Sequence, residues 1–287
     1  MTVGSGPLSP RNRRVTAARR LTKRGFRDSD RAFLAEGPQA VREALVRARE
    51  VPGSVTELFV GPGAEQRHSD LVTAATEAGV AVHRVGAADL AALAGTVTPQ
   101  GMVAVCRFLD VPLQVALAAS PALVVVLVCV RDPGNAGTVV RAADAAGADA
   151  VVLTDASVDP YNGKAVRASA GSLFHLPVVA GVPVTDAVTA LRAAGLRILA
   201  ADGAADRDLD DALDSGELAA PTAWLFGNEA WGLPADVAAL ADVSVRVPIH
   251  GRAESLNLAT AAAVCLYASA RAQRRTAPTP TMPGPRP

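Results

Sequence analysis

The sequence predicts an α/β protein made of a small N-terminal unit and a larger unit built on a parallel sheet. Short apolar runs rich in Val and Leu alternate with Ala-rich helical stretches along most of the chain. This alternation pauses between Arg107 and Pro121, an Ala-rich stretch that also contains Pro112, and then restarts. The chain has 287 residues, half of them apolar, which is enough to bury a core in each unit.

We expect four segments along the chain. Residues 1–10 contain Gly, Ser and Pro without periodicity, and residues 276–287 are rich in Pro, so both ends are predicted to be disordered. Residues 11–110 are assigned to the N-terminal unit and residues 111–275 to the larger unit.

The N-terminal unit begins with a predicted amphipathic helix from Val15. The elements after it are strands that alternate with helices, beginning with a strand, at residues 33–37, 38–49, 57–60, 69–78, 81–85, 87–94 and 102–107. Pro38 is acceptable in the first turn of its helix because an amide hydrogen there would have no helical acceptor.

The larger unit is predicted to contain short, continuous apolar strands, as in a parallel sheet covered on both faces. These strands are residues 122–130, 150–153, 196–201, 223–226 and 243–247. A long final helix is expected from Ser255 to Gln273. A doubly wound sheet places ligand sites at the carboxyl ends of its strands, so the loops after these runs are the candidates for chemistry.

Basic charge is concentrated at the N-terminus, although the whole chain has a net charge of zero. Residues 1–31 contain nine Lys or Arg against two Asp, a net charge of +7, so the remainder carries −7. A basic surface of this kind can bind nucleic acid phosphates, but a solvated Arg-rich helix face gives the same pattern. Composition alone does not separate these two interpretations.

The three cysteines indicate a reducing compartment. Cys106, Cys129 and Cys265 each lie in an apolar run, and none belongs to a CxxC or Cys/His cluster. We therefore expect neither disulfides nor a metal site. The longest apolar run, residues 122–130, is too short to span a bilayer, so a cytoplasmic protein without a membrane partner is expected.

Three polar segments follow predicted strands of the larger unit. Their sequences are NAGTVVR at residues 135–141, GNEAWG at residues 227–232 and SLN at residues 255–257. In this order and spacing they resemble motifs 1, 2 and 3 of the SpoU (TrmH-like) branch of the SPOUT methyltransferases. The resemblance implies a catalytic domain with a deep C-terminal trefoil knot, S-adenosylmethionine as cofactor, and methyl transfer to a ribose 2'-hydroxyl of RNA by a homodimer.

The resemblance also assigns roles to individual positions. The positions that match polar catalytic residues of the family are Arg141, Asn135, Glu229, Ser255 and Asn257. The positions that match its cofactor-binding loops are Gly227, Val247, Leu256, Ala201 and Ile249.

Two of these roles allow more than one chemistry. Arg141 is expected to activate the ribose hydroxyl, either by stabilising the alkoxide or by bridging a substrate phosphate that takes the proton, because Arg itself stays charged. Glu229 is either a general base or an acceptor for neighbouring backbone N–H groups, and we favour the acceptor.

The N-terminal unit resembles the substrate-binding extension of the same enzymes, whose fold is similar to ribosomal protein L30e. The resemblance rests on residues 21–27, 33–38 and 43–45 and favours RNA binding by the basic cluster: Arg13, Arg14, Arg19, Arg20, Lys23 and Arg24. Residues 161–174 resemble the family's K-x-x-R-x-S-x-G segment. Its Lys164 and Arg167 are expected to meet RNA phosphates or the facing subunit, unless this helix serves only for packing.

The extension favours 23S rRNA over tRNA as substrate, as in actinomycete enzymes that confer resistance to ribosome-targeting antibiotics. A Rossmann-type dehydrogenase is disfavoured because no GxGxxG follows an early strand. A non-catalytic RNA-binding protein of the same fold is disfavoured because the catalytic positions are retained.

Overall fold

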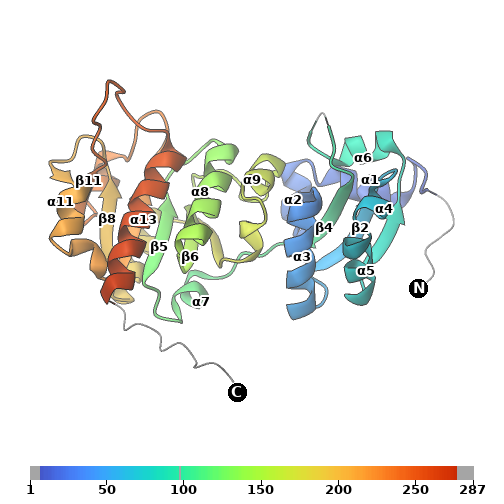
Figure 1. Cartoon of the computed structure of the whole chain (residues 1–287), viewed down its shortest axis with the longest axis horizontal. Helices are drawn as coiled ribbons and strands as arrows, with labels where there is room; N and C mark the ends of the chain where they lie inside the picture. Colours follow the sequence, from blue (N-terminus) through green and yellow to red (C-terminus); the bar gives the residue numbers. More distant parts are fainter. Residues whose placement is uncertain (1–6, 97, 277–287) are drawn as a thin grey trace, which may run out of the picture.

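The structure is a computed structural model that describes residues 7–96 and 98–276. Two sheets lie side by side along the long axis of the molecule (Figure 1). The predicted disorder of residues 1–6 and 277–287 lies outside the described residues. Leu8 was also predicted to be disordered, but it pairs with Val85 at the edge of the first sheet.

The N-terminal unit is a four-stranded mixed sheet with helices around it. The strand order is β1-β4-β2-β3, in which β4 runs antiparallel to both β1 and β2, and β2 runs parallel to β3. The strands are β1 Ala32–Glu36, β2 Val55–Val60, β3 Ala81–Arg84 and β4 Met102–Arg107. The helices are α1 Arg13–Arg20, α2 Arg24–Asp30, α3 Pro38–Glu50, α4 Ala64–Arg67, α5 Ser69–Glu77 and α6 Ala87–Leu93.

The C-terminal unit is a seven-stranded parallel sheet, as predicted, in the order β7-β6-β5-β10-β8-β11-β9. Its strands are β5 Leu123–Leu127, β6 Ala150–Thr154, β7 Val178–Val182, β8 Arg197–Ala201, β9 Arg207–Asp208, β10 Thr222–Phe226 and β11 Val243–Arg246. Its helices are α7 Leu113–Leu117, α8 Pro133–Ala146, α9 Gly163–Ala168, α10 Val184–Ala193, α11 Leu209–Asp214, α12 Ala235–Ala238 and α13 Leu258–Thr276, with short 3-10 turns at Ser172–Phe174 and Glu217–Ala219.

Strand β10 lies at the centre of the sheet, although it comes late in the sequence. It pairs with β5 on one side and β8 on the other, so the ends of strands distant in the chain become neighbours. The carboxyl ends of β5, β8, β10 and β11 therefore open onto one edge of the sheet. The trefoil knot implied by the resemblance stays a prediction.

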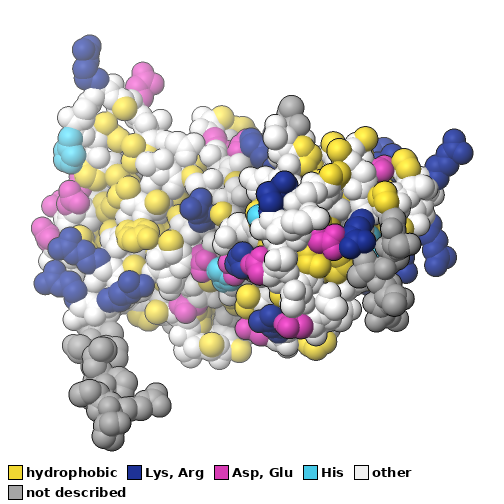
Figure 2. Space-filling model, turned by 45° about the vertical axis from the view of Figure 1, so that its right-hand side comes forward, with side chains coloured by type: hydrophobic (Ala, Val, Ile, Leu, Met, Phe, Trp, Pro, Cys, Tyr) yellow, Lys and Arg dark blue, Asp and Glu magenta, His cyan; other side chains and the backbone are white. Residues whose placement is uncertain are grey.

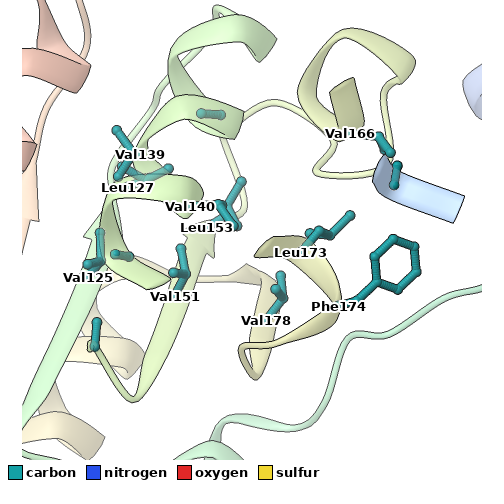
Figure 3. Packing of buried hydrophobic residues seen from close by; sticks show 14 of the residues in the cluster. Val125, Leu127, Val139, Val140, Val151, Leu153, Val166, Leu173, Phe174 and Val178 are labelled. Atoms are coloured by element: carbon teal, nitrogen blue, oxygen red, sulfur yellow. The ribbon is translucent and has the colours of Figure 1, made fainter. Parts of the chain in front are cut away.

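Helices cover both faces of the parallel sheet. On one face α8 and α13 lie side by side (Figure 1), and Val139 and Val140 of α8 pack over Leu127 and Leu153 (Figure 3). On the other face, α7, α10 and α12 contribute buried side chains to a second core cluster. Burial on both faces explains why the strands read as continuous apolar runs.

One core cluster extends across the junction between the two sheets. Phe33 of β1 lies 4.7 Å from Tyr161 and 5.9 Å from Phe174 between ring centroids, and Phe108 stacks on Tyr161 at 3.9 Å. The Tyr161 hydroxyl accepts from the backbone N–H groups of Leu109 and Asp110. The linker between the sheets is thus packed on the C-terminal unit.

A buried ion pair also crosses the junction. Arg27 of α2 donates through Nε and Nη2 to Asp159 at 2.9 and 2.6 Å, and its side chain is only 4% exposed. Removing one partner of such a pair costs about 3–5 kcal/mol. Arg27 therefore holds the two units together, although the sequence counted it among the basic residues of the N-terminus.

Several element bounds differ from those predicted. The helix after β5 begins at Pro133, within the turn before motif 1, because Asp132 is its N-cap and accepts from the Asn135 backbone N–H at 2.8 Å. The last helix begins at Leu258 and not at Ser255, because the Asn257 side chain caps it. Strands β7 and β9 were not predicted.

Candidate cofactor pocket and catalytic network

The loop after β10 closes on itself. Asn228 and Gly232 exchange two backbone hydrogen bonds of 2.9 Å, and a Cβ on Gly227 would lie 2.2 Å from the Gly232 carbonyl carbon. Glycine is therefore required at residue 227 by the loop's own backbone, because any side chain there would collide with Gly232 and Leu233.

Asn228 ties this loop to the neighbouring strand. It is 6% exposed, donates through Nδ2 to the Cys129 carbonyl at 2.8 Å, and accepts from the Ala230 N–H at 2.9 Å. Sequence reasoning gave Asn228 no role of its own. The only signal was its place between Gly227 and Glu229.

Side chains from all three motifs meet at the edge of the sheet. Asn257 donates through Nδ2 to Asn135 Oδ1 at 3.0 Å, and Asn135 donates through Nδ2 to Glu229 Oε1 at 3.1 Å. Glu229 also accepts from the backbone N–H groups of Arg131 and Asp132 at 3.4 and 3.3 Å. Three of the five predicted catalytic residues thus form one network, with Glu229 as its acceptor.

A cavity of about 530 Å³ opens beside this network, at the ends of β8, β10 and β11. All five residues predicted to bind the cofactor line it: Ala201, Gly227, Val247, Ile249 and Leu256. Glu229 and Ser255 line it as well. Its size lies within the range of about 300–1,000 Å³ typical of small-molecule sites.

The turn that carries Asn135 is held by helix α9. Lys164 Nζ lies 2.6 Å from Asp132 Oδ2, and this hydrogen bond and that of the Asn135 N–H lower the pKa of Asp132. A Cβ on Gly137 would lie 2.2 Å from the Ala165 carbonyl oxygen. The glycine of motif 1 therefore allows α8 and α9 to pack in contact.

The other basic residue of α9 faces the N-terminal unit. Arg167 Nη1 lies 3.0 Å from Glu36 Oε2, and the Glu36 side chain is only 6% exposed. Both Lys164 and Arg167 thus pair with carboxylates of this chain. These contacts favour the packing interpretation of the helix over the RNA interpretation.

Arg141 lies apart from the network. It is exposed, and within the described ranges it makes no hydrogen bond or ion pair. It follows Asn135 by six residues on α8, a rise of about 9 Å and a turn to a different face of the helix. Within the described residues, Arg141 thus has no hydrogen bond to Asn135, Glu229 or Asn257, and it does not line the cavity.

The six basic residues predicted to bind RNA in α1 and α2 are exposed: Arg13, Arg14, Arg19, Arg20, Lys23 and Arg24. Arg14 pairs with Glu57, and the Arg20 guanidinium lies 3.9 Å from the centroid of the Phe26 ring. Figure 2 shows Lys and Arg side chains projecting from the N-terminal unit. Arg24 also pairs with Asp28, at 3.5 Å. Within the described residues the other four, Arg13, Arg19, Arg20 and Lys23, form no ion pair, so their charge is available to a partner, unlike that of buried Arg27.

No metal site is formed within residues 7–96 and 98–276, because no group of three or more His, Cys, Asp or Glu side chains converges there. The cysteines are free, and burial raises the pKa of Cys265 to about 12. None of the helices described has the length and hydropathy to cross a membrane.

Comparison with known proteins accounts for this arrangement. Residues 122–267 match the SpoU rRNA Methylase family, and residues 34–112 match RNA 2'-O ribose methyltransferase substrate binding. The chain belongs to the SpoU rRNA methylase family. It is an S-adenosylmethionine-dependent RNA ribose 2'-O-methyltransferase, which confirms the resemblance read from the three motifs.

Relatives match along most of the chain. The 23S rRNA (guanosine(2553)-2'-O)-methyltransferase RlmP of Bacillus subtilis is 34% identical over 262 residues, which are 90% of this chain and 96% of the relative. The 23S rRNA (uridine(2479)-2'-O)-methyltransferase of Streptomyces viridochromogenes is 43% identical over 157 residues, covering 52% and 53% of the two chains.

Solved structures of SpoU methyltransferases share the fold. The AdoMet-bound rRNA methyltransferase from Sinorhizobium meliloti has a TM-score of 0.78 and 31% identity, over 92% of this chain and 96% of its own. AviRb from Streptomyces viridochromogenes in complex with AdoMet has a TM-score of 0.76 and 30% identity, over 93% and 100%.

The residues of the cavity fit the cofactor. Phe226, Val247 and Leu256 offer apolar walls to a purine, and the loop backbones offer polar groups to its edges. The carboxylates of Asp202 and Glu254 are suited to the hydroxyls and positive charges of the rest of the molecule.

Proposed function

We propose that this enzyme methylates a ribose 2'-hydroxyl in 23S rRNA and works as a homodimer in the cytoplasm. The 23S substrate is supported by the relatives named above, which act on 23S rRNA and one of which spans nearly the full chain. The observation that carries the proposal is the network of Asn257, Asn135 and Glu229 at the rim of the cavity.

Bound S-adenosylmethionine supplies a methyl group on a positively charged sulfur. The chain's part is to hold the ribose oxygen in line with that carbon, and positioning of this kind can supply much of the acceleration. Glu229 is occupied by backbone and amide donors, so it fixes the loops of motifs 1 and 2 and does not take the proton. Just before α13, Ser255 lines the cavity and Asn257 donates to Asn135, so both are polar groups close to the proposed ribose position.

We infer that Arg141 completes the catalytic site of a second subunit. Arg141 is exposed on α8, and the neighbouring helix α13 also exposes apolar side chains, Val264 at 40% and Tyr267 at 54%. The Tyr267 hydroxyl donates to the Ala145 carbonyl at 3.4 Å, so α13 contacts α8 one helical turn beyond Arg141. Hydrophobic side chains gathered on the C-terminal unit in Figure 2 are of the kind that a subunit interface covers.

We propose that residues 11–110 bind the RNA substrate and residues 111–275 carry out the reaction. The exposed cluster of α1 and α2 supplies phosphate contacts, and the buried pair of Arg27 and Asp159 fixes its place relative to the catalytic unit. Resistance to a ribosome-targeting antibiotic is a consequence that a suitably placed methyl group in 23S rRNA can have.

Arg141→Ala tests both the chemistry and the dimer. Single-turnover transfer of tritiated methyl into unmethylated 23S rRNA should fall roughly 100-fold or more, the scale of losing one preorganised donor, with cofactor affinity unchanged. Mixing this variant with Gly227→Val, whose pocket loop cannot close, should restore activity through mixed dimers that contain one intact composite site. A wild-type rate for Arg141→Ala would show that Arg141 takes no part in the reaction. Methyl transfer into tRNA but not into 23S rRNA would show that tRNA is the substrate.

A further inference from the structure

An exposed aromatic side chain lies next to the catalytic network. The chain has two tryptophans. Trp224 in β10 is fully buried and donates to Ser269 Oγ at 2.9 Å, whereas Trp231 in the loop after β10 is 54% exposed. An exposed indole offers a flat apolar face that a binding partner can cover.

Among the described residues, Arg131 contacts the ring of Trp231. The Arg131 guanidinium lies over its ring, 5.1 Å from the centroid, and within the described part of the chain it forms no ion pair. A cation over one face leaves the opposite face of the indole as part of the exposed surface. The pair therefore offers an open ring face and an uncompensated positive charge side by side.

This pair is fixed to the reaction site through Glu229. The Arg131 backbone N–H donates to Glu229 Oε2 at 3.4 Å, and Trp231 follows Glu229 by two residues in the loop that lines the cavity. A ribose that reaches the cavity rim must bring its base and flanking phosphates to the surrounding loops.

We propose that Trp231 and Arg131 form a stacking platform for a nucleobase at or next to the methylated nucleotide. This proposal rests on RNA methylation as the proposed function and identifies a contact that orients the substrate. Every base has a face that can stack on an indole, and the guanidinium can meet the adjoining phosphate. The position of the pair beside the cavity, where the substrate ribose must enter, favours RNA over a second protein subunit as the occupant.

Intrinsic fluorescence provides a test that does not depend on methylation. RNA stacked on Trp231 should quench the exposed tryptophan, while buried Trp224 serves as an internal reference. Titration with a 23S rRNA transcript, with excitation at the red edge of the tryptophan band where RNA does not absorb, should quench the wild type but leave Trp231→Phe unchanged. Equal quenching in both proteins, or none in the wild type, would overturn the proposal.

Steady-state kinetics with 23S rRNA provides a second test. Trp231→Ala should raise KM for 23S rRNA about 10-fold, in keeping with the loss of one stacked base, and Trp231→Phe should recover most of it. Val115→Ala, at a residue 59% exposed on α7, is the matched control and should behave as the wild type. Unchanged KM in Trp231→Ala would sink the platform but leave the methyltransferase assignment intact. Conversion of Trp231→Ala from dimer to monomer in sedimentation would show that a second subunit covers the ring.

Discussion

Glu229 is defined by what surrounds it. Its carboxylate accepts from one amide side chain and two backbone N–H groups, all from the turn that follows β5. These donors support the acceptor role that the sequence favours for Glu229, which stays a prediction. Because the donors come from motif 1, Glu229 joins the two loops that any substrate must contact.

Glu229→Gln separates an acceptor from a general base. Glutamine keeps one carbonyl oxygen for these donors, so single-turnover methylation should fall by less than about 10-fold, whereas Glu229→Ala leaves the donors unpaired and should lose about 100-fold. The measurement is the rate at saturating 23S rRNA and cofactor. A complete loss of methylation in Glu229→Gln, accompanied by normal cofactor binding, would show that Glu229 acts as a general base.

Residue identity predicted some contacts and not others. The motif resemblance placed Asn135, Glu229 and Asn257 in one site, and the structure joins them by hydrogen bonds. The pairing of Lys164 with Asp132 could not be read from the sequence, because it depends on how α8 and α9 pack. The burial of Arg27 could not be predicted from the sequence either, because Arg27 lies in a run of exposed arginines.

At the scale of elements, burial explains which strands were predictable. Strands β5, β6, β8 and β10 lie inside the sheet and are covered on both faces, so their continuous apolar runs were correctly predicted. Strand β7 is at one edge and contains Gly181, while β9 at the other edge has only two residues, Arg207 and Asp208. Gly181 interrupts the apolar run of β7, and a strand of two polar residues has no pattern to detect.

Helices α1 and α9 both carry predicted RNA-binding residues, and the structure distinguishes them. The arginines of α1 are exposed, but Arg167 of α9 pairs with buried Glu36. Replacing Arg13, Arg14, Arg19 and Arg20 with Gln should weaken RNA binding and flatten the plot of log affinity against log salt, because fewer counterions are released. Arg167→Gln should leave the slope unchanged.

Filter binding over a range of salt concentrations gives both slopes. The Arg167 variant is the control, since it removes a positive charge without removing a proposed phosphate contact. An unchanged slope in the fourfold variant would show that the α1 arginines form a solvated helix face and do not contact RNA phosphates. A reduced slope for Arg167→Gln would show that Arg167 contacts RNA phosphates.

At the scale of the whole molecule, a histidine links the two units. His175 Nδ1 lies 2.7 Å from an Asp144 oxygen of α8, and Nε2 lies 3.2 Å from a Glu43 oxygen of α3. Burial lowers the pKa of His175, but the hydrogen bonds and attraction from these two carboxylates outweigh it, so the pKa is raised above its ordinary value of 6.5. The fold therefore favours the protonated ring.

The stability from His175 should depend on pH with a definite sign. It is fully present below the ordinary pKa and is lost as pH rises through the raised value of the folded protein. The Tm difference between the wild type and His175→Gln should thus be largest at about pH 6 and shrink toward about pH 8.5. Thermal unfolding of both proteins across that range checks it, and a constant difference would exclude the charged bridge.

The central claim is that the cavity and network transfer a methyl group to a ribose oxygen of 23S rRNA. The most direct measurement is mass spectrometry of nucleosides from unmethylated 23S rRNA after incubation with enzyme and S-adenosylmethionine carrying a deuterated methyl group. We predict one 2'-O-methylated nucleoside carrying the label, near one per rRNA molecule, and its loss in Arg141→Ala. A label on a base, or no label in 23S rRNA, would contradict it.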